Sequence, residues 1–231
     1  MAKRRHNGSL FDERIIVNDL SSSAGEAYQR LQVNVDLASI DSKLKVIGIT
    51  SSTKSEGKST TIVNLANIYA RKNKKVCVID LDLRRPSLHY FFKKPNDVGL
   101  VDYVLGEIDK EHVVKHSEEG IDFINTGKHT PFPAQVLESK NLMDLIEYLK
   151  GIYDFVLLDC PPILVSADTT IISKFTDGFI FVVKTNSTVK DALGDSLEAL
   201  RNCGANIIGA VMTDVPSGRG TDYYGYGYYK Y

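Results

Sequence analysis

The chain has 231 residues, 43% of them hydrophobic and 25% charged, with a formal net charge of −1 at neutral pH. This length is enough for one large domain with a substantial core. A nearly neutral chain lacks the basic field that attracts nucleic acids, and no apolar stretch approaches the roughly 20 residues of a membrane span. Lys3, Arg4 and Arg5 are not followed by an apolar segment, so we expect no signal peptide.

Helical and strand patterns alternate along the chain. A capping pattern of Ser23 and Glu26 opens the first predicted helix, which we expect to reach about Ser39. The last helix is expected to start near Thr188, with Asp191 completing a second capping pattern. The other predicted helices are 59–72, 100–105 and 134–150, and the predicted strands are 45–49, 76–81, 121–125, 155–158, 178–183 and 207–212. Strands that are apolar along their whole length are typical of a parallel sheet covered on both faces.

The three cysteines, Cys77, Cys160 and Cys203, form neither an even set nor a C-x-x-C pair. This usage favours a reducing, cytoplasmic compartment. Cys77 lies in a predicted strand and Cys160 follows a candidate site aspartate, and for both a buried structural role is favoured over a redox role.

A phosphate-binding pattern separates the first predicted strand from the helix that follows it. Residues 52–59 match G-x-x-x-x-G-K-[ST] except that Ser52 stands at the first glycine position. Because serine is small, successive backbone N–H groups and the positive end of the helix can still hold a phosphate. A polar loop that only caps a helix is the alternative, which the position behind a buried strand disfavours. The candidate nucleotide-binding residues are Ser52, Thr53, Lys54, Ser55, Glu56, Gly57, Lys58, Ser59 and Thr60.

Two further predicted strands end in carboxylates. In V-I-D-L-D-L-R, the strand period of two puts Asp80 and Asp82 on one face. Two such carboxylates repel each other unless a cation or a donor lies between them, and Mg²⁺ at a strand's carboxyl end would meet that need. The alternative is a pair of exposed loop acids that pair with Arg84 and Arg85. Four apolar residues precede Asp159, which is the form of a Walker B strand.

Six of the last nine residues are tyrosines. Such a segment has no aliphatic residues with which to form a core, so we expect it to be mobile. Beside a phosphate-binding loop, it indicates that one part of the molecule handles ATP and another accepts phosphate. An adhesive low-complexity segment is the alternative, but it leaves the pairing with a P-loop unexplained. The candidate acceptors are Tyr223, Tyr224, Tyr226, Tyr228, Tyr229 and Tyr231.

These four features occur in the order found in the bacterial tyrosine kinases that regulate capsular and exopolysaccharide synthesis, and the chain resembles that family from about Ser51 to Tyr231. The resemblance implies a P-loop NTPase-like α/β fold, with a mostly parallel sheet and helices on both faces, and ATP with Mg²⁺ as cofactors. We expect residues 1–22 to be irregular, 23–215 to form the kinase domain and 216–231 to form a flexible tail that is phosphorylated in trans.

The resemblance also implies the Gram-positive arrangement, in which a separate soluble kinase is activated by the cytoplasmic tail of a membrane adaptor. The expected location is therefore the cytoplasm, at the inner face of the cell membrane through that adaptor. The implied partners are an adaptor of the polysaccharide co-polymerase type, a cognate tyrosine phosphatase and further copies of the chain, with no nucleic acid.

As a mechanism, Lys58 and the loop amides offset charge on the β,γ-phosphates, and the Ser59 hydroxyl ligates Mg²⁺. Asp159 and one of the Asp80/Asp82 pair hold the metal through water. The remaining carboxylate takes the proton of the tyrosine hydroxyl, whose pKa is about 10. Of the pair we favour Asp80 as the base, and we expect Arg84 to orient a carboxylate or a phosphate.

Part of the first helix departs from the family pattern. The segment E-x-x-R-x-x-R, which helps to form rings of subunits, has Glu26 here but Gln29 and Gln32 in place of the arginines. Arg30 points about 100° away on a helix. Glutamine has neither the charge nor the bidentate fork of arginine, so this segment lacks those ring contacts.

Two other departures concern the nucleotide. Lys54-Ser55 replaces a common Pro-Gly, which should alter the stiffness of the loop. Thr213 stands where an asparagine that contacts the base is often found, so we assign no residue to reading the adenine base.

Two other functions compete with the kinase reading. The first is a partition or septum-positioning ATPase of the same superfamily. Such ATPases often carry a second lysine at the position of Thr53, five residues before the loop lysine, and they lack a tyrosine tail. A non-catalytic scaffold derived from such a kinase would fit Gln29 and Gln32, but the loop lysine and the three aspartates are all present.

Overall fold

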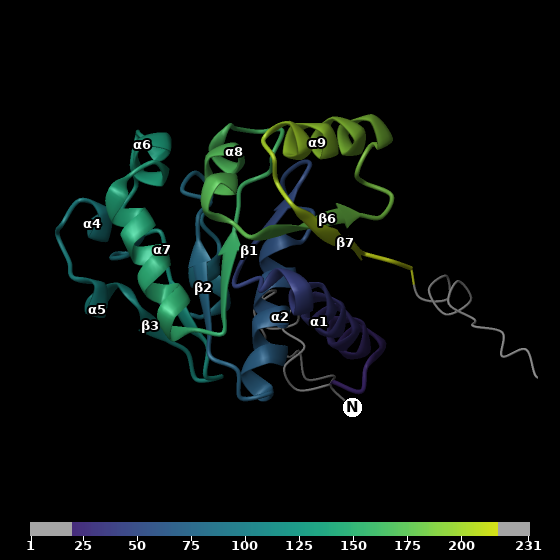
Figure 1. Ribbon diagram of the computed structural model, residues 1–231, viewed down its shortest axis with the longest axis horizontal. Helices are drawn as coiled ribbons and strands as arrows, with labels where there is room; N and C mark the ends of the chain where they lie inside the picture. Colours follow the sequence, from purple (N-terminus) through teal and green to yellow (C-terminus); the bar gives the residue numbers. More distant parts are fainter. Residues whose placement is uncertain (1–19, 217–231) are drawn as a thin grey trace, which may run out of the picture.

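One sheet organises the chain (Figure 1). The computed structural model describes residues 20–216, so most of the expected irregular N-terminal segment and all six tail tyrosines lie outside the described residues. Within residues 20–216 the strand order is β3-β4-β2-β5-β1-β6-β7, and every neighbouring pair is parallel except β3 with β4. The strands are β1 (Val46–Ser51), β2 (Val76–Asp80), β3 (Lys115–His116), β4 (Asp122–Ile124), β5 (Phe155–Asp159), β6 (Gly178–Lys184) and β7 (Ile207–Thr213). The predicted mostly parallel sheet is confirmed.

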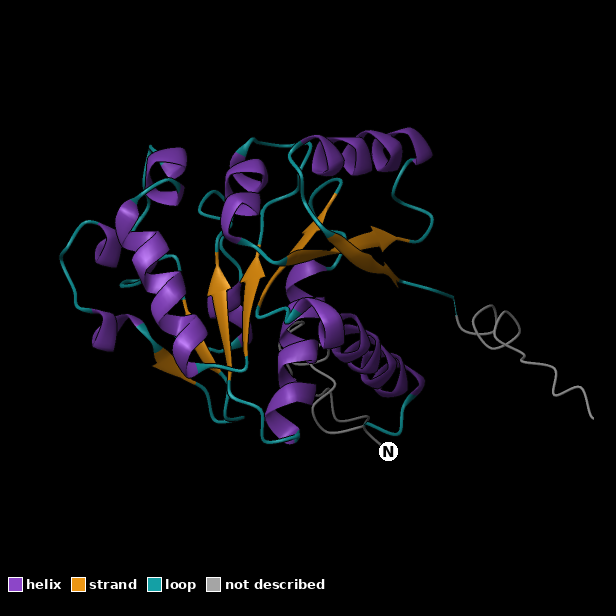
Figure 2. Cartoon of the chain, viewed as in Figure 1, coloured by secondary structure: helices purple, strands orange, loops and turns teal. Residues whose placement is uncertain are grey.

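Helices cover both faces of this sheet, as predicted (Figures 1 and 2). The first three pack on one face and the remaining ones on the other, each over its own set of buried apolar side chains. The helices are α1 (Ser23–Ser42), α2 (Lys58–Arg71), α3 (Leu88–Phe91), α4 (Leu100–Val104), α5 (Lys110–Val113), α6 (Pro133–Leu137), α7 (Lys140–Ile152), α8 (Asp168–Ile172) with the 3₁₀ turn η2 (Ser173–Phe175), and α9 (Lys190–Asn202). Among the described residues, none of these helices has the length and apolar character needed to cross a membrane.

The continuous apolar runs of the strands follow from this two-sided cover. In β5, Leu157 joins the core beneath α1–α3, while its neighbours Val156 and Leu158 join the core beneath the other helices. Successive strand side chains point to opposite faces, so a strand that is covered on both sides is apolar throughout. Cys77 and Cys160 are fully buried in the core beneath helices α4 to α9, in agreement with the structural role predicted for them.

Several predicted boundaries are wrong for local reasons. The predicted helix over 134–150 is two helices, because Ser139 starts a new one by accepting a hydrogen bond from the Leu142 amide (3.2 Å). The first helix is capped by Ser22, not Ser23. Helix α9 begins after Thr188, whose hydroxyl accepts from the Lys184 amide (2.9 Å) in the preceding loop. The two-residue β3 carries no pattern that would predict it.

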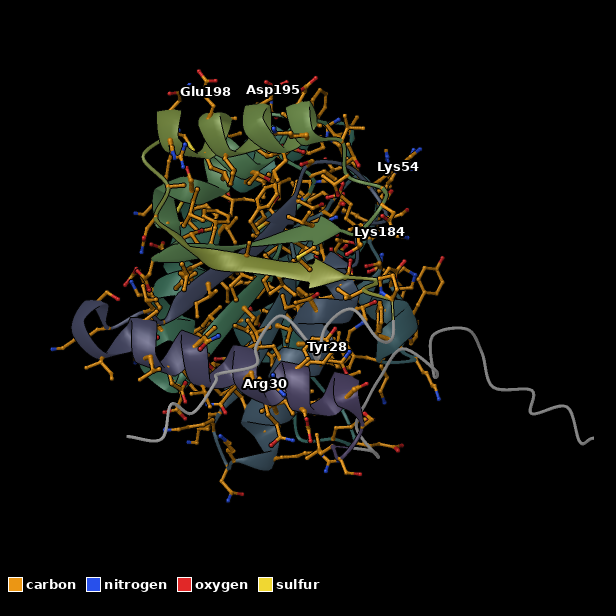
Figure 3. The ribbon with its side chains drawn as sticks, turned by 90° about the vertical axis from the view of Figure 1, so that its right-hand side faces the viewer. Tyr28, Arg30, Lys54, Lys184, Asp195 and Glu198 are labelled. Carbon is orange, nitrogen blue, oxygen red and sulfur yellow. The ribbon has the colours of Figure 1, made fainter. Side chains whose placement is uncertain are left out.

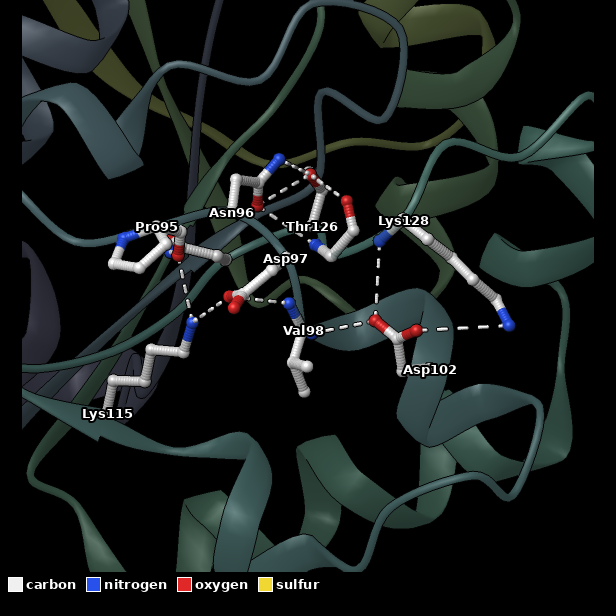
Figure 4. Close-up of polar contacts among 11 residues, drawn as sticks. Pro95, Asn96, Asp97, Val98, Asp102, Lys115, Thr126 and Lys128 are labelled. Carbon is white, nitrogen blue, oxygen red and sulfur yellow. Dashed lines mark hydrogen bonds and ion pairs between the residues drawn. The ribbon is translucent and has the colours of Figure 1, made fainter.

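A polar junction ties α4 to the end of β4 (Figure 4). The buried Asp102 carboxylate accepts hydrogen bonds from the amides of Gly99 (2.8 Å) and Lys128 (3.3 Å). The backbones come so close that a Cβ on Gly99 would lie 2.2 Å from the Asn125 carbonyl oxygen. Only glycine fits this crossing, because the obstacle is backbone that no side-chain rotation can move.

We predict that Gly99→Ala destabilises the domain by about 2–4 kcal/mol, because the junction must open to admit the methyl group. The matched control is Gly151→Ala, where an added Cβ meets nothing within 4 Å in the last turn of α7. That change should be neutral or stabilising by up to about 1 kcal/mol. Thermal unfolding followed by circular dichroism measures both, and equal melting temperatures for the two variants would contradict the prediction.

Candidate active site

The candidate site forms where three adjacent strands end. Strand β5 lies between β1 and β2, so the carboxyl ends of all three strands meet at one edge of the sheet. Asp80 is in register with Asp159, and Asp159 with Ile49 of β1. Residues 80 and 159, which are far apart in the sequence, are therefore neighbours, and the loop after β1 opens beside them. This edge is where ligands bind in open α/β sheets.

The loop after β1 has the backbone of a phosphate cradle. Gly57 has a φ of +100°, and a Cβ there would lie 3.1 Å from the side chain of Thr213. Gly57 is also the N-cap of the 14-residue helix α2, and no side chain caps the first amides of that helix. These amides and the helix dipole remain available for an anion. Ser55 takes a φ of +64°, in the left-handed region that favours glycine, so replacing the common glycine here costs about 1–2 kcal/mol.

Glu56 braces this loop. Its buried carboxylate accepts hydrogen bonds from the Ser52 amide (3.1 Å) and from the hydroxyls of Thr53 and Thr188 (both 2.9 Å). Its backbone carbonyl accepts from the Thr213 hydroxyl (2.7 Å). The loop is thus tied to the β6–α9 connection and to the end of β7. Sequence reasoning gave Glu56 only a backbone role, because its partners at 188 and 213 are distant in the chain.

Lys54 and Lys184 lie on the same side of the molecule, near the carboxyl ends of β6 and β7 (Figure 3). Lys54 is exposed at the tip of the loop, while Lys184 pairs with Asp214 at 3.1 Å. Thr213 is engaged with Glu56, so its hydroxyl already has a structural partner within the described residues.

The polar centre of the site joins α2 to β5. The Ser59 hydroxyl donates a 2.6 Å hydrogen bond to Asp159 Oδ2, and the Ser87 hydroxyl donates to Ser59 Oγ, also at 2.6 Å. The other carboxylate oxygen of Asp159 is buried and has no hydrogen-bond partner in residues 20–216. Lys58 is 8% exposed at the start of α2. Ser87 was not among the predicted site residues, because no motif marks it.

The two aspartates of the D-x-D motif differ in their surroundings. Asp80 is 1% exposed, and its carboxylate accepts from the amides of Ser87 (2.9 Å), Leu88 (3.1 Å) and Asp82 (3.2 Å). Asp82 lies beyond the end of β2, is partly exposed and accepts from the Arg85 amide (3.0 Å). The expectation that both lie on one strand face is wrong, because β2 ends at Asp80.

All three carboxylates have raised pKa values. Burial raises the pKa of Asp159 to about 6, against the favourable charge of Lys58. Burial, followed by repulsion from Asp159, raises the pKa of Asp80 well above its usual range. Burial also raises the pKa of Asp82, again opposed by Lys58. Perturbed acids that converge on one cleft are typical of functional sites.

Among the described residues, the Arg84 guanidinium forms its ion pair outside its own motif. Its guanidinium pairs with the buried Asp168 at the start of α8, with Nε–Oδ2 at 2.7 Å and Nη2–Oδ1 at 3.3 Å. This bidentate pair fixes the β2 loop to α8 and raises the pKa of Arg84. In the described residues the Arg84 guanidinium thus orients Asp168, not Asp80 or Asp82, and its expected contact with a phosphate stays a prediction.

The residues at this edge fit a hard divalent cation. Hydroxyl and carboxylate oxygens are the ligands that Mg²⁺ prefers, and the unpartnered oxygen of Asp159 supplies one more. In residues 20–216 no group of three or more His, Cys, Asp or Glu side chains could hold a metal unaided. A cation at this edge therefore needs further oxygens from water and from phosphates.

The fold and its sequence have known relatives. A family of AAA domains matches residues 44–201. Tyrosine-protein kinase YwqD of Bacillus subtilis is 36% identical, and the match covers 99% of this chain and 96% of that protein. The kinase domain of Escherichia coli tyrosine kinase ETK superposes with a TM-score of 0.86 at 29% identity, over 98% of this chain and 88% of that one. The chimerical protein CapA2B2 gives 0.85 at 30% identity, over 88% and 91% of the two chains.

A more distantly related structure shares the fold of this chain at lower sequence identity. The septum site-determining protein MinD of Pyrococcus horikoshii, complexed with Mg-ADP, gives a TM-score of 0.62 at 22% identity, over 73% of this chain and 69% of that one. That likeness shows a shared P-loop NTPase-like fold. Within this fold class, the chain belongs to the AAA-domain family and, more narrowly, to the bacterial tyrosine-protein kinases, which confirms the resemblance drawn from its motifs.

We predict that Asp159→Asn removes a pH dependence of stability in the metal-free protein. The folded-state pKa of Asp159, about 6, exceeds the ordinary value of 3.8, so the folded protein binds more protons between these values. Wild-type stability must then fall as pH rises through this window, by on the order of 1–3 kcal/mol. In EDTA, the melting temperatures of the two proteins should converge towards the acid end of the window. Above the window, at higher pH, the variant should have the higher melting temperature. A constant difference across the window would refute this.

Proposed function

We propose that this chain transfers the γ-phosphoryl group of ATP to tyrosine hydroxyls in the 216–231 tail of a second copy, and thereby regulates capsular or exopolysaccharide synthesis. The observation that carries the proposal is the arrangement of Lys58, Ser59 and Asp159 around a carboxylate oxygen without a partner, in a member of the tyrosine-kinase family. The nucleotide and Mg²⁺ are part of the proposal.

In this proposal the residues act chiefly by position and charge. Lys58 and the first amides of α2 neutralise the β,γ-phosphates, while Ser59 and Asp159 hold Mg²⁺. The metal supplies charge neutralisation between phosphate oxygens. Each phosphate added to the tail brings about −1.5 to −2 charges. A multiply phosphorylated tail is then repelled by the acidic edge and leaves the site.

Asp82 is a better candidate for the base than Asp80. Asp80 is buried and its oxygens are occupied by three amides, whereas Asp82 is partly exposed at the mouth of the site. A base must come within about 3 Å of the phenol that it deprotonates. From the sequence we favoured Asp80, although no motif distinguishes the two acids strongly; the structure leads us to prefer Asp82.

The cellular setting is also proposed. One curated relative from Klebsiella pneumoniae is described as a putative tyrosine-protein kinase in a cps region, which supports a role beside polysaccharide synthesis genes. We place the chain in the cytoplasm, held at the membrane by an adaptor of the polysaccharide co-polymerase type. A cognate tyrosine phosphatase would remove the phosphates from its tyrosines. The partition ATPase alternative rests on likeness of fold alone, and the scaffold alternative is opposed by an intact set of site residues.

We expect Asp82→Asn to lower the rate of phosphoryl transfer by about 100-fold or more, because a positioned base contributes about 10²–10⁴. Its melting temperature should stay close to wild type. Asp80→Asn should instead leave turnover within about tenfold of wild type, because the Asp80 carboxylate is buried and held by backbone amides. Radiolabelled ATP turnover compares the two variants, and thermal unfolding shows whether each is folded. Wild-type turnover in the Asp82 variant would return the base role to Asp80.

A mixing experiment tests the acceptor and the direction of transfer. Lys58→Met should abolish self-phosphorylation, and deletion of residues 222–231 should remove the acceptors while ATP still binds. When the tail-deleted protein is mixed with the Lys58→Met protein and Mg-ATP, phosphotyrosine should appear on the latter. Mass spectrometry maps the modified positions. If wild type modifies itself but the mixture stays unmodified, transfer occurs within one chain.

A further inference from the structure

Large apolar side chains are exposed on two connections that leave the carboxyl edge of the sheet. Phe132 ends the connection from β4 to α6, and Leu164 and Val165 lie in the connection from β5 to α8; they are 59%, 42% and 60% exposed. Both connections leave the carboxyl edge of the sheet, where Asp159 lies. We call these three residues the apolar rim. Apolar side chains gathered at the mouth of a site mark a contact surface.

The two parts of the rim are held side by side. Helices α6 and α8 lie on the same face of the sheet (Figure 1) and pack against each other. Near their far ends Lys174 pairs with Glu138 at 3.6 Å. Because both helices leave the same sheet edge, the connections that precede them are also neighbours. The rim is therefore one surface contributed by two connections.

The rim is fixed to the catalytic edge through charged residues. Asp168, which opens α8 just after the rim, holds Arg84 at 2.7 Å, and Arg84 lies two residues after Asp82. The next residue, Arg85, donates its backbone N–H to Asp82 Oδ1 at 3.0 Å. The Arg85 side chain is exposed and has no ion-pair or hydrogen-bond partner in the described part of the chain. Arg85 thus adjoins the candidate base through its backbone and offers a cation without a partner in the described residues.

We propose that the apolar rim and Arg85 form the surface on which the tyrosine-rich segment of a second copy docks for phosphorylation. The inference rests on the proposed function and adds the residues that recognise the acceptor. The segment is rich in phenol rings, which pack on Phe, Leu and Val side chains, and Asp222 adjoins its first tyrosine. Arg85 complements Asp222 and the first phosphate installed, before further phosphates bring the repulsion described above. A tail modified once is therefore held better for further transfers.

The rim is tested with the tail-deleted protein as enzyme and the Lys58→Met protein as acceptor. The double change Leu164→Ser with Val165→Ser should raise KM for the acceptor about tenfold, with kcat and nucleotide affinity nearly unchanged. The matched control is Ile152→Ser, because Ile152 is 41% exposed but lies at the opposite end of β5, next to its start. An unchanged KM in the double variant overturns the inference.

Arg85→Gln is tested by the number of phosphates on each acceptor molecule, counted by mass spectrometry. Multiply phosphorylated species should give way to singly phosphorylated ones, and Arg201→Gln, an exposed arginine on α9, should have no effect. An unchanged distribution overturns the role of Arg85.

The failure of this inference differs from that of the proposed function. If the unmodified enzyme never labels the Lys58→Met acceptor, the proposed trans transfer fails. If it does and the rim variants behave alike, only the docking surface fails. Loss of stimulation by an adaptor tail at unchanged KM would assign the rim to that activator and overturn the inference.

Discussion

The site depends on the close approach of two buried carboxylates. Asp80 and Asp159 end adjacent strands in register, and each is only 1% exposed. Burial raises the pKa of both, and repulsion from Asp159 adds to the rise at Asp80. A fold gains no stability from such a pair, since desolvated like charges are costly. The amides of Ser87 and Leu88 and the hydroxyl of Ser59 reduce that cost only in part. A cation with phosphates would remove the remainder, which links the fold of this edge to its ligand.

The phosphate loop is shaped by contacts from outside itself. Glu56 collects donors from the β6–α9 connection and from Thr213, the last residue of β7. The chain continues from β7 towards the tyrosine-rich segment. The strand that leads to the proposed acceptor segment is thus joined to the phosphate loop by the hydrogen bond from Thr213 to Glu56. Strands β6 and β1 separate β7 from β5 and β2, whose ends carry Asp159 and Asp80.

The parts of the molecule that could be predicted are those with local signals. An apolar run followed by Asp159, or a loop of GKST type before a helix, can be recognised from a segment of about ten residues. The contacts that were missed join distant segments: Arg84 with Asp168, Glu56 with Thr188 and Ser59 with Ser87. Each depends on which strand ends become neighbours, and the insertion of β5 between β1 and β2 is not visible in any one segment. The same limit explains the Asp80/Asp82 assignment, because the end of β2 decides which acid is buried.

The glutamines of α1 show how a departure from a family pattern acquires a structural meaning. Gln29 donates to the Leu20 carbonyl, and Gln32, 2% exposed, bonds to Asp36 and accepts from Lys72 on the neighbouring helix α2. Both side chains are thus used within the chain. The outer side of α1 instead presents Val33, Leu37 and Ile40, which are 47%, 60% and 69% exposed and spaced to lie on one helix face. The same face carries the exposed Glu26–Arg30 pair one to two turns earlier. A second copy that meets this helix would therefore meet aliphatic side chains beside one ion pair, and the aliphatic part of such a contact should resist added salt better than guanidinium pairs do.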